Sequence, residues 1–222
     1  RIDPRLRPLG KDGPLAMDIN GYKRYFKEWA QLWERQAYIK ARYVAGDRGL
    51  ADDFIGLAND FVYASQITEK DVTEINRVRQ RMIDELIEPS NKDRHIKLSP
   101  GGIVDIEFIT QLLQLRCGHD DKDVRKANTI SALLSLRERG YIPEADYYAL
   151  SNAYHFLRGI EHGLRIVEDS AQNVLPFDKG ALNRLAKRIG YLGRNNLGSR
   201  LLKDFKVKCK TVRGIYNKMF LP

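Results

Sequence analysis

The spacing of apolar residues from Asp18 onward constrains the fold most strongly, because it follows the period of an α-helix. Five apolar side chains fall on one stripe of such a helix: Tyr22, Phe26, Trp29, Trp33 and Ala37. We therefore expect one long helix here, ended or bent at Gly46. Further helices are expected at 50–63, 71–88, 103–117, 123–139, 143–169, 178–190 and 197–220. The chain is predicted to be all-α, a bundle of seven or eight helices with antiparallel neighbours.

The first seventeen residues break this pattern. Pro4, Pro8 and Pro14 prevent a continuous helix, and isolated apolar residues among charges fit a short strand that ends in a loop. Side chains alternate along a strand, so four charged residues share one face: Arg1, Asp3, Arg5 and Arg7. One carboxylate among guanidinium groups suits Mg²⁺ together with a polyphosphate. The alternative is a solvated edge strand held by local ion pairs.

Charge and composition narrow the classes of partner. The 222 residues include 38 Lys and Arg against 29 Asp and Glu, a net charge of +9 that is concentrated in residues 1–48 and 195–222. The two basic ends suggest a phosphate-bearing partner, but a basic surface that keeps the protein soluble is the favoured interpretation of the charge alone. Nucleic acid is not expected, because the basic face of the last helix carries no interleaved aromatic residue.

Membrane spans and cysteines bear on the cellular location of the protein. No stretch of 18 apolar residues exists to span a bilayer, so no membrane partner is expected. The two cysteines, Cys117 and Cys209, are too few for a disulfide framework, which favours the cytoplasm. The chain opens on Arg1 rather than Met, which predicts that an upstream region precedes it.

The segment Leu98–Phe108 is a second candidate site. Gly101 and Gly102 enter a helix, where glycine lets a phosphate or another backbone approach the helix N-terminus. Ser99 and Pro100 are expected to cap this helix, and Gly118 to end it. Asp105 either binds a bridging cation or complements the helix dipole. A polar stripe of Glu107, Gln111 and Gln114 predicts either an inter-helix hydrogen-bond network or the wall of a cleft.

Two charged positions interrupt apolar stripes on other helices. Lys40 prolongs the Tyr22–Ala37 stripe with Arg42 close by, so it either snorkels outward or points into an anion site. Glu161 interrupts an apolar face, and Arg158 and Arg165 lie at helical spacing from it. A structural ion pair is the favoured interpretation of Glu161.

Four stretches together resemble one family. They are RIDPRLRPLGKDGPLA (1–16), WERQAYIKAR with VAGD (33–47), KLSPGGIVDIEFITQLLQL (97–115) and AYHFLRGIEH (153–162). In order and spacing they are similar to the bacterial bifunctional glutamine synthetase adenylyltransferase/adenylyl-removing enzyme, and the resemblance covers essentially the whole chain. That family has two homologous halves, each a nucleotidyltransferase fold followed by a helical domain.

The resemblance implies where one domain ends and the next begins, and to which half of the enzyme the chain corresponds. Residues 1–17 are expected to be the C-terminal remnant of a nucleotidyltransferase domain, and 18–222 the helical bundle domain. LRGIEHGLRI at 157–166, followed by Leu175-Pro176, is more similar to the adenylyl-removing half.

The resemblance also implies a chemistry. Such enzymes use Mg²⁺ to transfer AMP from ATP to a tyrosine of glutamine synthetase, or to remove it with inorganic phosphate as ADP. Asp3 is then the catalytic metal ligand. The implied contacts with nucleotide and phosphate are Arg5, Arg7, Lys40 and Arg42, while Gly101, Gly102, Asp105 and Glu107 would place the helical domain against the active-site cleft.

One departure from the family pattern predicts that the chain is inactive by itself. The family's Gly-Ser-x-x-Asp-x-Asp motif is missing, because the only Gly-Ser here, Gly198-Ser199, has Leu202 where the first of the paired aspartates is needed. The alternative function is a module that docks glutamine synthetase or the PII signal protein. A basic nucleic-acid-binding helical domain is the weaker alternative.

Overall fold

The computed structural model describes residues 7–166 and 173–221, and these ranges are built from α-helices. Within them no strand forms, and the single β-bridge joins His95 to Val174. The predicted all-α class is therefore confirmed. The helices are α1 (Ile19–Glu28), α2 (Leu32–Tyr38), α3 (Arg48–Val62), α4 (Glu69–Leu86), α5 (Ile103–Cys117), α6 (Thr129–Glu138), α7 (Glu144–Arg165), α8 (Lys179–Arg188) and α9 (Leu197–Phe220).

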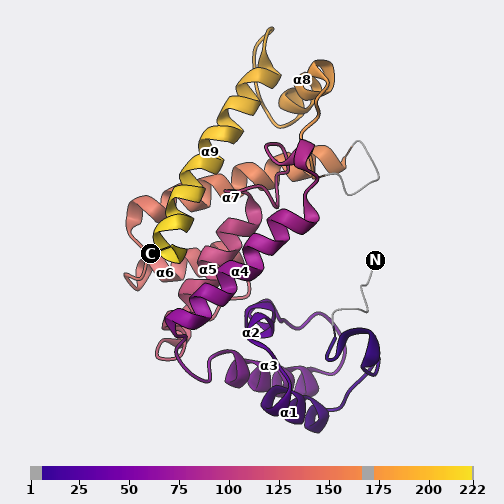
Figure 1. The fold of residues 1–222 in the computed structure, drawn as a ribbon, viewed down its shortest axis with the longest axis vertical. Helices are drawn as coiled ribbons and strands as arrows, with labels where there is room; N and C mark the ends of the chain where they lie inside the picture. Colours follow the sequence, from indigo (N-terminus) through magenta and orange to yellow (C-terminus); the bar gives the residue numbers. More distant parts are fainter. Residues whose placement is uncertain (1–6, 167–172, 222) are drawn as a thin grey trace.

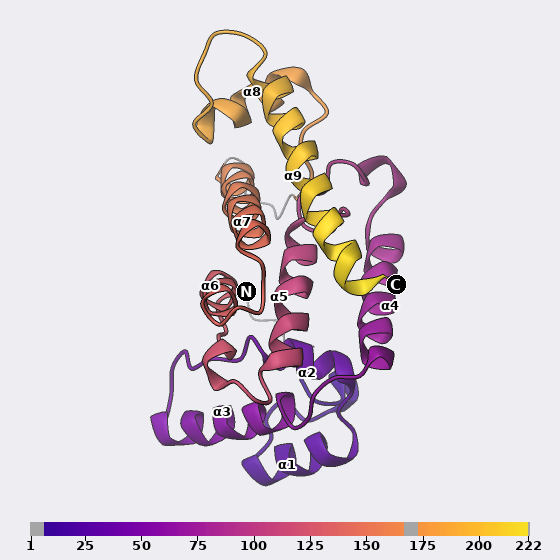
Figure 2. The same ribbon diagram turned by 90° about the vertical axis from the view of Figure 1, so that its left-hand side faces the viewer.

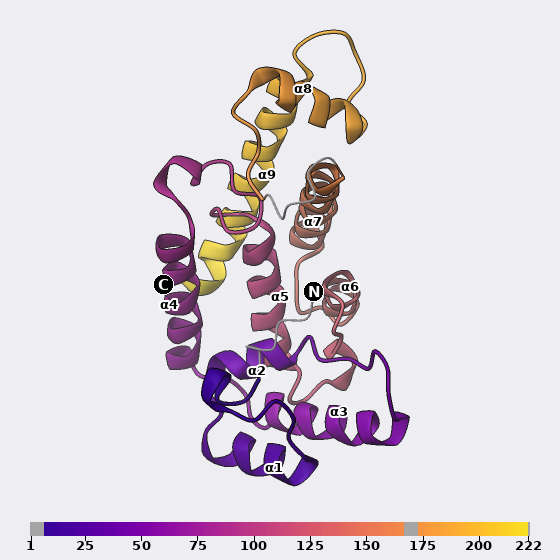
Figure 3. The same ribbon diagram turned by 90° about the vertical axis from the view of Figure 1, so that its right-hand side faces the viewer.

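Helix α5 lies at the centre of the bundle. Figures 2 and 3 show α6 and α7 on one side of it and α4 and α9 on the other. Eleven of its fifteen residues are buried, as expected for a helix that is apolar around its circumference. In Figure 1, α1–α3 gather at one end of the molecule, and α8 lies against the start of α9 at the other.

The single long helix expected through Tyr22–Ala37 is wrong. The chain turns between Glu28 and Leu32, because the Glu34 carboxylate accepts a hydrogen bond from the Gln31 amide (2.7 Å) in a capping box that starts a new helix. The turn leaves Trp29 and Trp33 61% and 53% exposed instead of buried. The described ranges consequently contain nine α-helices rather than seven or eight.

Two other helix starts differ from expectation. Ser99 and Pro100 do not cap α5, which begins at Ile103 with Gly102 as its N-cap. The Ser99 hydroxyl instead donates to the Lys92 carbonyl oxygen (2.5 Å). The helix expected at 123–139 begins only at Thr129, because Asn128 accepts from the Ser131 amide (3.0 Å) and caps it there.

Other expectations held or lie outside the described residues. Gly118 ends α5 and Pro143 precedes α7, as predicted. The N-terminal strand falls mainly on residues 1–6, which the structure does not describe, and the domain division at residue 17 stays a prediction.

Candidate functional site

The structure does not describe Asp3 or Arg5, so their predicted metal and phosphate contacts stay predictions. Arg7 is half-buried, and its guanidinium donates to the carbonyl oxygens of Gly13 (3.1 Å) and Lys11 (3.3 Å). Arg42 is exposed on the loop after α2. Lys40 is half-buried beside α6, where its amine donates to the Thr129 hydroxyl (2.6 Å).

Charged side chains of α5 and α7 lie together with Lys97 from the loop before α5, and their charges act on Lys40 from the loop after α2. We call this group the charged cluster. It consists of Lys40, Lys97, Glu107, Arg158, Glu161 and Arg165.

Glu161 is the buried carboxylate that pairs with three basic residues of the cluster. Its side chain is only 2% exposed, and its Oε2 lies 2.6 Å from Arg158 Nη1. Its Oε1 lies 2.9 Å from Lys97 Nζ and 2.7 Å from Arg165 Nη2. The predicted ion pair with Arg158 and Arg165 is confirmed, and Lys97 is an additional partner. Burial raises the pKa of Glu161, but hydrogen bonds from Arg158 and Lys97 outweigh it and hold that pKa below the usual 4.5.

Glu107 joins α5 to the α7 side chains of the cluster. It lies 3.6 Å from Arg158 Nη2 and accepts a hydrogen bond from the Tyr154 hydroxyl (3.4 Å). Burial lowers the pKa of Lys40, while the charge of Glu107 acts in the opposite direction and Arg158 adds to the lowering. Glu107, Lys40 and Arg158 therefore share one electrostatic environment.

The cluster presents its cations outward. Glu161 is covered, whereas the side chains of Lys97, Arg158 and Arg165 are 28%, 37% and 49% exposed. Four basic residues face two acidic ones, so the group has excess positive charge. Buried carboxylates that hold exposed guanidinium and ammonium groups in place form a surface suited to an anion such as phosphate.

The polar stripe on α5 is an inter-helix network over much of its length. Gln111 accepts from the Gln36 amide (2.7 Å), which ties α5 to α2. Gln114 donates to the carbonyl oxygens of Val124 (2.7 Å) and Lys126 (2.9 Å). Only Glu107, at the start of the stripe, reaches the charged cluster.

Asp105 lies in the interior, away from Glu107. Its side chain is 0% exposed; Oδ1 accepts from Arg79 Nε (2.7 Å), and Oδ2 accepts from the Gly101 amide (2.6 Å) and Arg213 (3.1 Å). These bonds join α4, α5 and α9. Asp105 is thus occupied by structural contacts, and its predicted cofactor contact stays a prediction.

The two glycines before α5 permit close packing against neighbouring backbone. Gly101 has φ +80°, and a Cβ there would lie 1.9 Å from the Cys209 carbonyl oxygen of α9. A Cβ on Gly102 would lie 2.6 Å from the Lys97 carbonyl oxygen. Both glycines therefore have a packing role, and their predicted nucleotide contact also stays a prediction.

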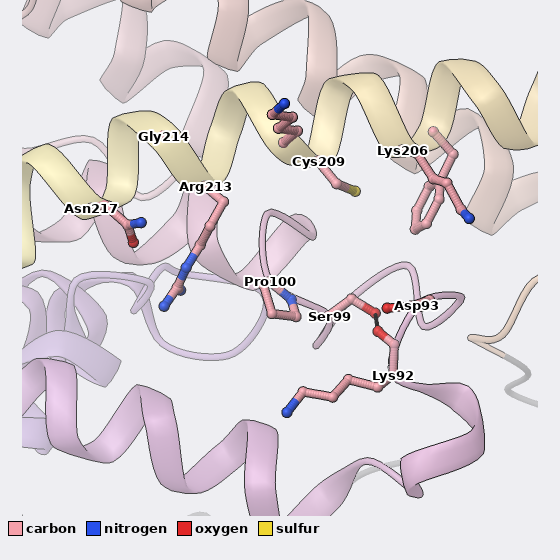
Figure 4. A pocket seen from close by; sticks show the side chains of 11 residues that line it. Lys92, Asp93, Ser99, Pro100, Lys206, Cys209, Arg213, Gly214 and Asn217 are labelled. Atoms are coloured by element: carbon pink, nitrogen blue, oxygen red, sulfur yellow. Dashed lines mark hydrogen bonds between the residues drawn. The ribbon is translucent and has the colours of Figure 1, made fainter.

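A basic groove of about 590 Å³ lies between α9 and the loop before α5, and Arg213, which binds Asp105, lines it. In Figure 4, Arg213 and Lys206 extend from α9 on one side, and Ser99 and Pro100 lie on the opposite loop. The groove is separate from the charged cluster, with which it shares no residue.

Sequence reasoning missed Arg79 and Lys97. Arg79 lies on the buried face of α4 with Val72, Ile75 and Ile83, so an arginine at the spacing of an apolar stripe was the available signal. Lys97 gave no such signal, because its partner Glu161 is distant in sequence and joins it only in the folded chain.

Within residues 7–166 and 173–221, no three His, Cys, Asp or Glu side chains gather closely enough to hold a metal ion. The Mg²⁺ ligand predicted at Asp3 lies outside that part of the chain. Among the same residues, none of the helices has the length and apolar character needed to cross a membrane.

Two family models match the chain in succession. Residues 1–56 match the model described as glutamate-ammonia ligase adenylyltransferase, and residues 67–220 match that described as GlnD PII-uridylyltransferase. The boundary between the matches falls near the end of α3.

Curated relatives from three bacteria match the chain across both ranges, and each carries the name bifunctional glutamine synthetase adenylyltransferase/adenylyl-removing enzyme. The relative from Streptomyces coelicolor is 35% identical over 219 residues, which is 99% of this chain and 22% of the relative. That from Cutibacterium acnes is 37% identical over 190 residues (86% and 19%). That from Mycobacterium bovis is 34% identical over 223 residues (99% and 22%). The chain thus spans about a fifth of the length of these relatives.

Proposed function

Because this chain belongs to the family of bifunctional glutamine synthetase adenylyltransferase/adenylyl-removing enzymes and, over residues 67–220, to the family described as GlnD PII-uridylyltransferase, we propose that it is the helical part of a longer nucleotidyltransferase. That enzyme moves an adenylyl group on or off a tyrosine of glutamine synthetase. The motif at 157–166 favours the adenylyl-removing half.

The proposed reaction is the transfer of the adenylyl group from tyrosine to inorganic phosphate, by substitution at the phosphorus of adenylyl-tyrosine. An oxygen of inorganic phosphate bonds to that phosphorus, and the bond to the tyrosine oxygen breaks. ADP forms, and the tyrosine oxygen takes up a proton. Mg²⁺ would neutralise charge on the reacting phosphate, with Asp3 as one ligand.

The observation that carries the proposal is the charged cluster. Its exposed cations, held by the covered Glu161 carboxylate, are the kind of group that binds and orients inorganic phosphate. Arg158 is the best-placed of these because Glu161, Glu107 and Tyr154 all fix its guanidinium. Positioning of this kind supplies much of the catalysis in phosphoryl transfer.

The first test uses the complete enzyme that contains this chain and measures phosphate-dependent release of ADP from adenylylated glutamine synthetase. Arg158→Gln is expected to raise KM for phosphate about tenfold or more, since it removes a charged contact. The matched control is Arg48→Gln, on the exposed face of α3, which should leave KM unchanged. Equal KM values for both variants would contradict the role given to the cluster.

The second test concerns Asp3. Asp3→Asn in the same enzyme is expected to lower the rate by tenfold or far more, because a metal ligand is lost. A rate within about twofold of the unaltered enzyme would show that Asp3 is not a ligand.

Docking of PII is a second candidate function. It is supported by the description of the family model over residues 67–220, which names PII as the substrate of that family. Binding of purified PII to the chain, measured by calorimetry, tests it; the absence of heat at millimolar PII would exclude it.

A further inference from the structure

A pocket of about 520 Å³ lies between the N-terminal turn, residues 7–10, and helices α1 and α2. Both tryptophans of the sequence, Trp29 and Trp33, line it, and they are 61% and 53% exposed. Tyr25 and Tyr38 add two further aromatic side chains. We call it the tryptophan pocket. Its volume lies in the range of small-molecule binding sites.

The buried carboxylate of its wall is already hydrogen-bonded. Glu34 is 5% exposed; it accepts one hydrogen bond from the Tyr25 hydroxyl (2.5 Å) and another from the Gln31 amide (2.7 Å). This carboxylate is held within the α1–α2 turn. What the pocket offers a ligand is therefore mainly aromatic surface.

Basic side chains complete the lining. Lys40 lines the pocket, and the charges of Glu107 and Arg158 in the charged cluster act on its amine, which also donates to the Thr129 hydroxyl. Arg7 contributes a second positive charge from the N-terminal turn. A ligand that fits this arrangement has a flat aromatic body and an anionic end directed at Lys40.

We infer that the tryptophan pocket binds the adenine ring of the adenylyl group by stacking on Trp29 and Trp33, with the adenylyl phosphate directed at Lys40. The choice of adenine rests on the proposed function. Stacking suits the tryptophans because bases gain binding energy on aromatic faces. The charged cluster then lies on the phosphate side of the nucleotide, where inorganic phosphate must approach.

The 222-residue chain provides its own probe, since its only tryptophans line the pocket. We expect AMP to change their fluorescence saturably, after correction for absorption by the nucleotide. Adenosine should do so more weakly, and ribose 5-phosphate should leave it unchanged. No saturable change up to millimolar AMP, or equal binding of ribose 5-phosphate, would overturn the inference.

Substitutions test the contact with the base and the contact with the phosphate separately. Trp33→Ala should weaken AMP and adenosine binding alike, about tenfold or more, with Trp29 as the remaining reporter. Lys40→Gln should weaken AMP but not adenosine. The controls are Tyr148→Ala, an aromatic half-exposed on α7, and Lys70→Gln on the exposed face of α4. Circular dichroism of each variant verifies its folding, and Trp33→Leu replaces Trp33→Ala if that variant fails to fold.

These results are separable from those on the proposed function. If AMP does not bind the pocket while the complete enzyme releases ADP, the pocket inference alone fails. If AMP binds as described and the complete enzyme shows no adenylyl chemistry, the proposed function fails and the pocket remains a purine-nucleotide site.

Discussion

Arg79 donates from Nε to Asp105 Oδ1 over 2.7 Å, and both side chains are completely excluded from solvent. Arg213, from α9, reaches the other carboxylate oxygen. One carboxylate thus joins three helices that are far apart in sequence. Because a buried charge without its partner is costly, this junction is more sensitive to substitution than any exposed ion pair of the described residues.

Asp105→Ala is expected to lower the free energy of unfolding by about 3–5 kcal/mol, because it leaves Arg79 charged and buried without compensation. Urea denaturation followed by circular dichroism measures the loss. The control is Asp52→Ala, whose exposed pair with Arg48 should contribute less than about 1 kcal/mol. Similar losses of unfolding free energy in both variants would contradict the prediction that the buried Arg79 charge needs the Asp105 carboxylate.

Gly101→Ala and Gly140→Ala separate backbone strain from steric contact. Both glycines have positive φ (+80° and +77°), so both alanines incur a strain of about 1–2 kcal/mol. Only the Gly101 variant also drives a Cβ into the Cys209 carbonyl, since nothing lies within 4 Å at Gly140. We expect the Gly101 variant to lose about 1–3 kcal/mol more. Equal denaturation midpoints would disprove the close approach of α9.

Cys209 should resist alkylation. Burial raises the pKa of its thiol from 9.0 to about 12, so near neutral pH it holds roughly a thousandfold less reactive thiolate than an ordinary cysteine. Cys117 is less buried and should be modified first. Mass spectrometry after iodoacetamide treatment, with and without urea, measures this order. Rapid modification of Cys209 in the folded chain would contradict its burial.

Glu161 should make the fold sensitive to acid. Its pKa is held below 4.5 in the folded chain, so its stabilising contribution is present above about pH 4.5 and is lost as the pH falls through the folded value. Glu161→Gln is expected to flatten the acid side of the stability curve. Glu138→Gln, at the exposed end of α6, should leave the curve as it is. Denaturant midpoints measured across the acid range provide the comparison.

The helices were largely predictable because their signals are local. Apolar spacing together with Gly118 and Pro143 located α5 and α7 close to their observed ends. The failure at Glu28–Leu32 is instructive, because the stripe through Trp29 and Trp33 suggested burial. A capping box at Gln31 and Glu34 overrode that pattern.

The candidate site was predictable only in part. Glu161 with Arg158 and Arg165 follows from spacing along one helix, whereas the spacing at Lys40 left open either an outward lysine or an anion site. Lys97 and Arg79 were not anticipated, since their partners Glu161 and Asp105 are distant in sequence.

The sequence by itself determined the helical class, most helix boundaries and the family, because periodicity, caps and motifs are carried by neighbouring residues. Only the tertiary structure decided that Asp105 is buried between two arginines while Glu107, two residues later, lies 3.6 Å from Arg158. Residues two apart on a helix point about 200° from each other. Which side meets the interior depends on how the surrounding helices pack, and that is a property of the whole chain.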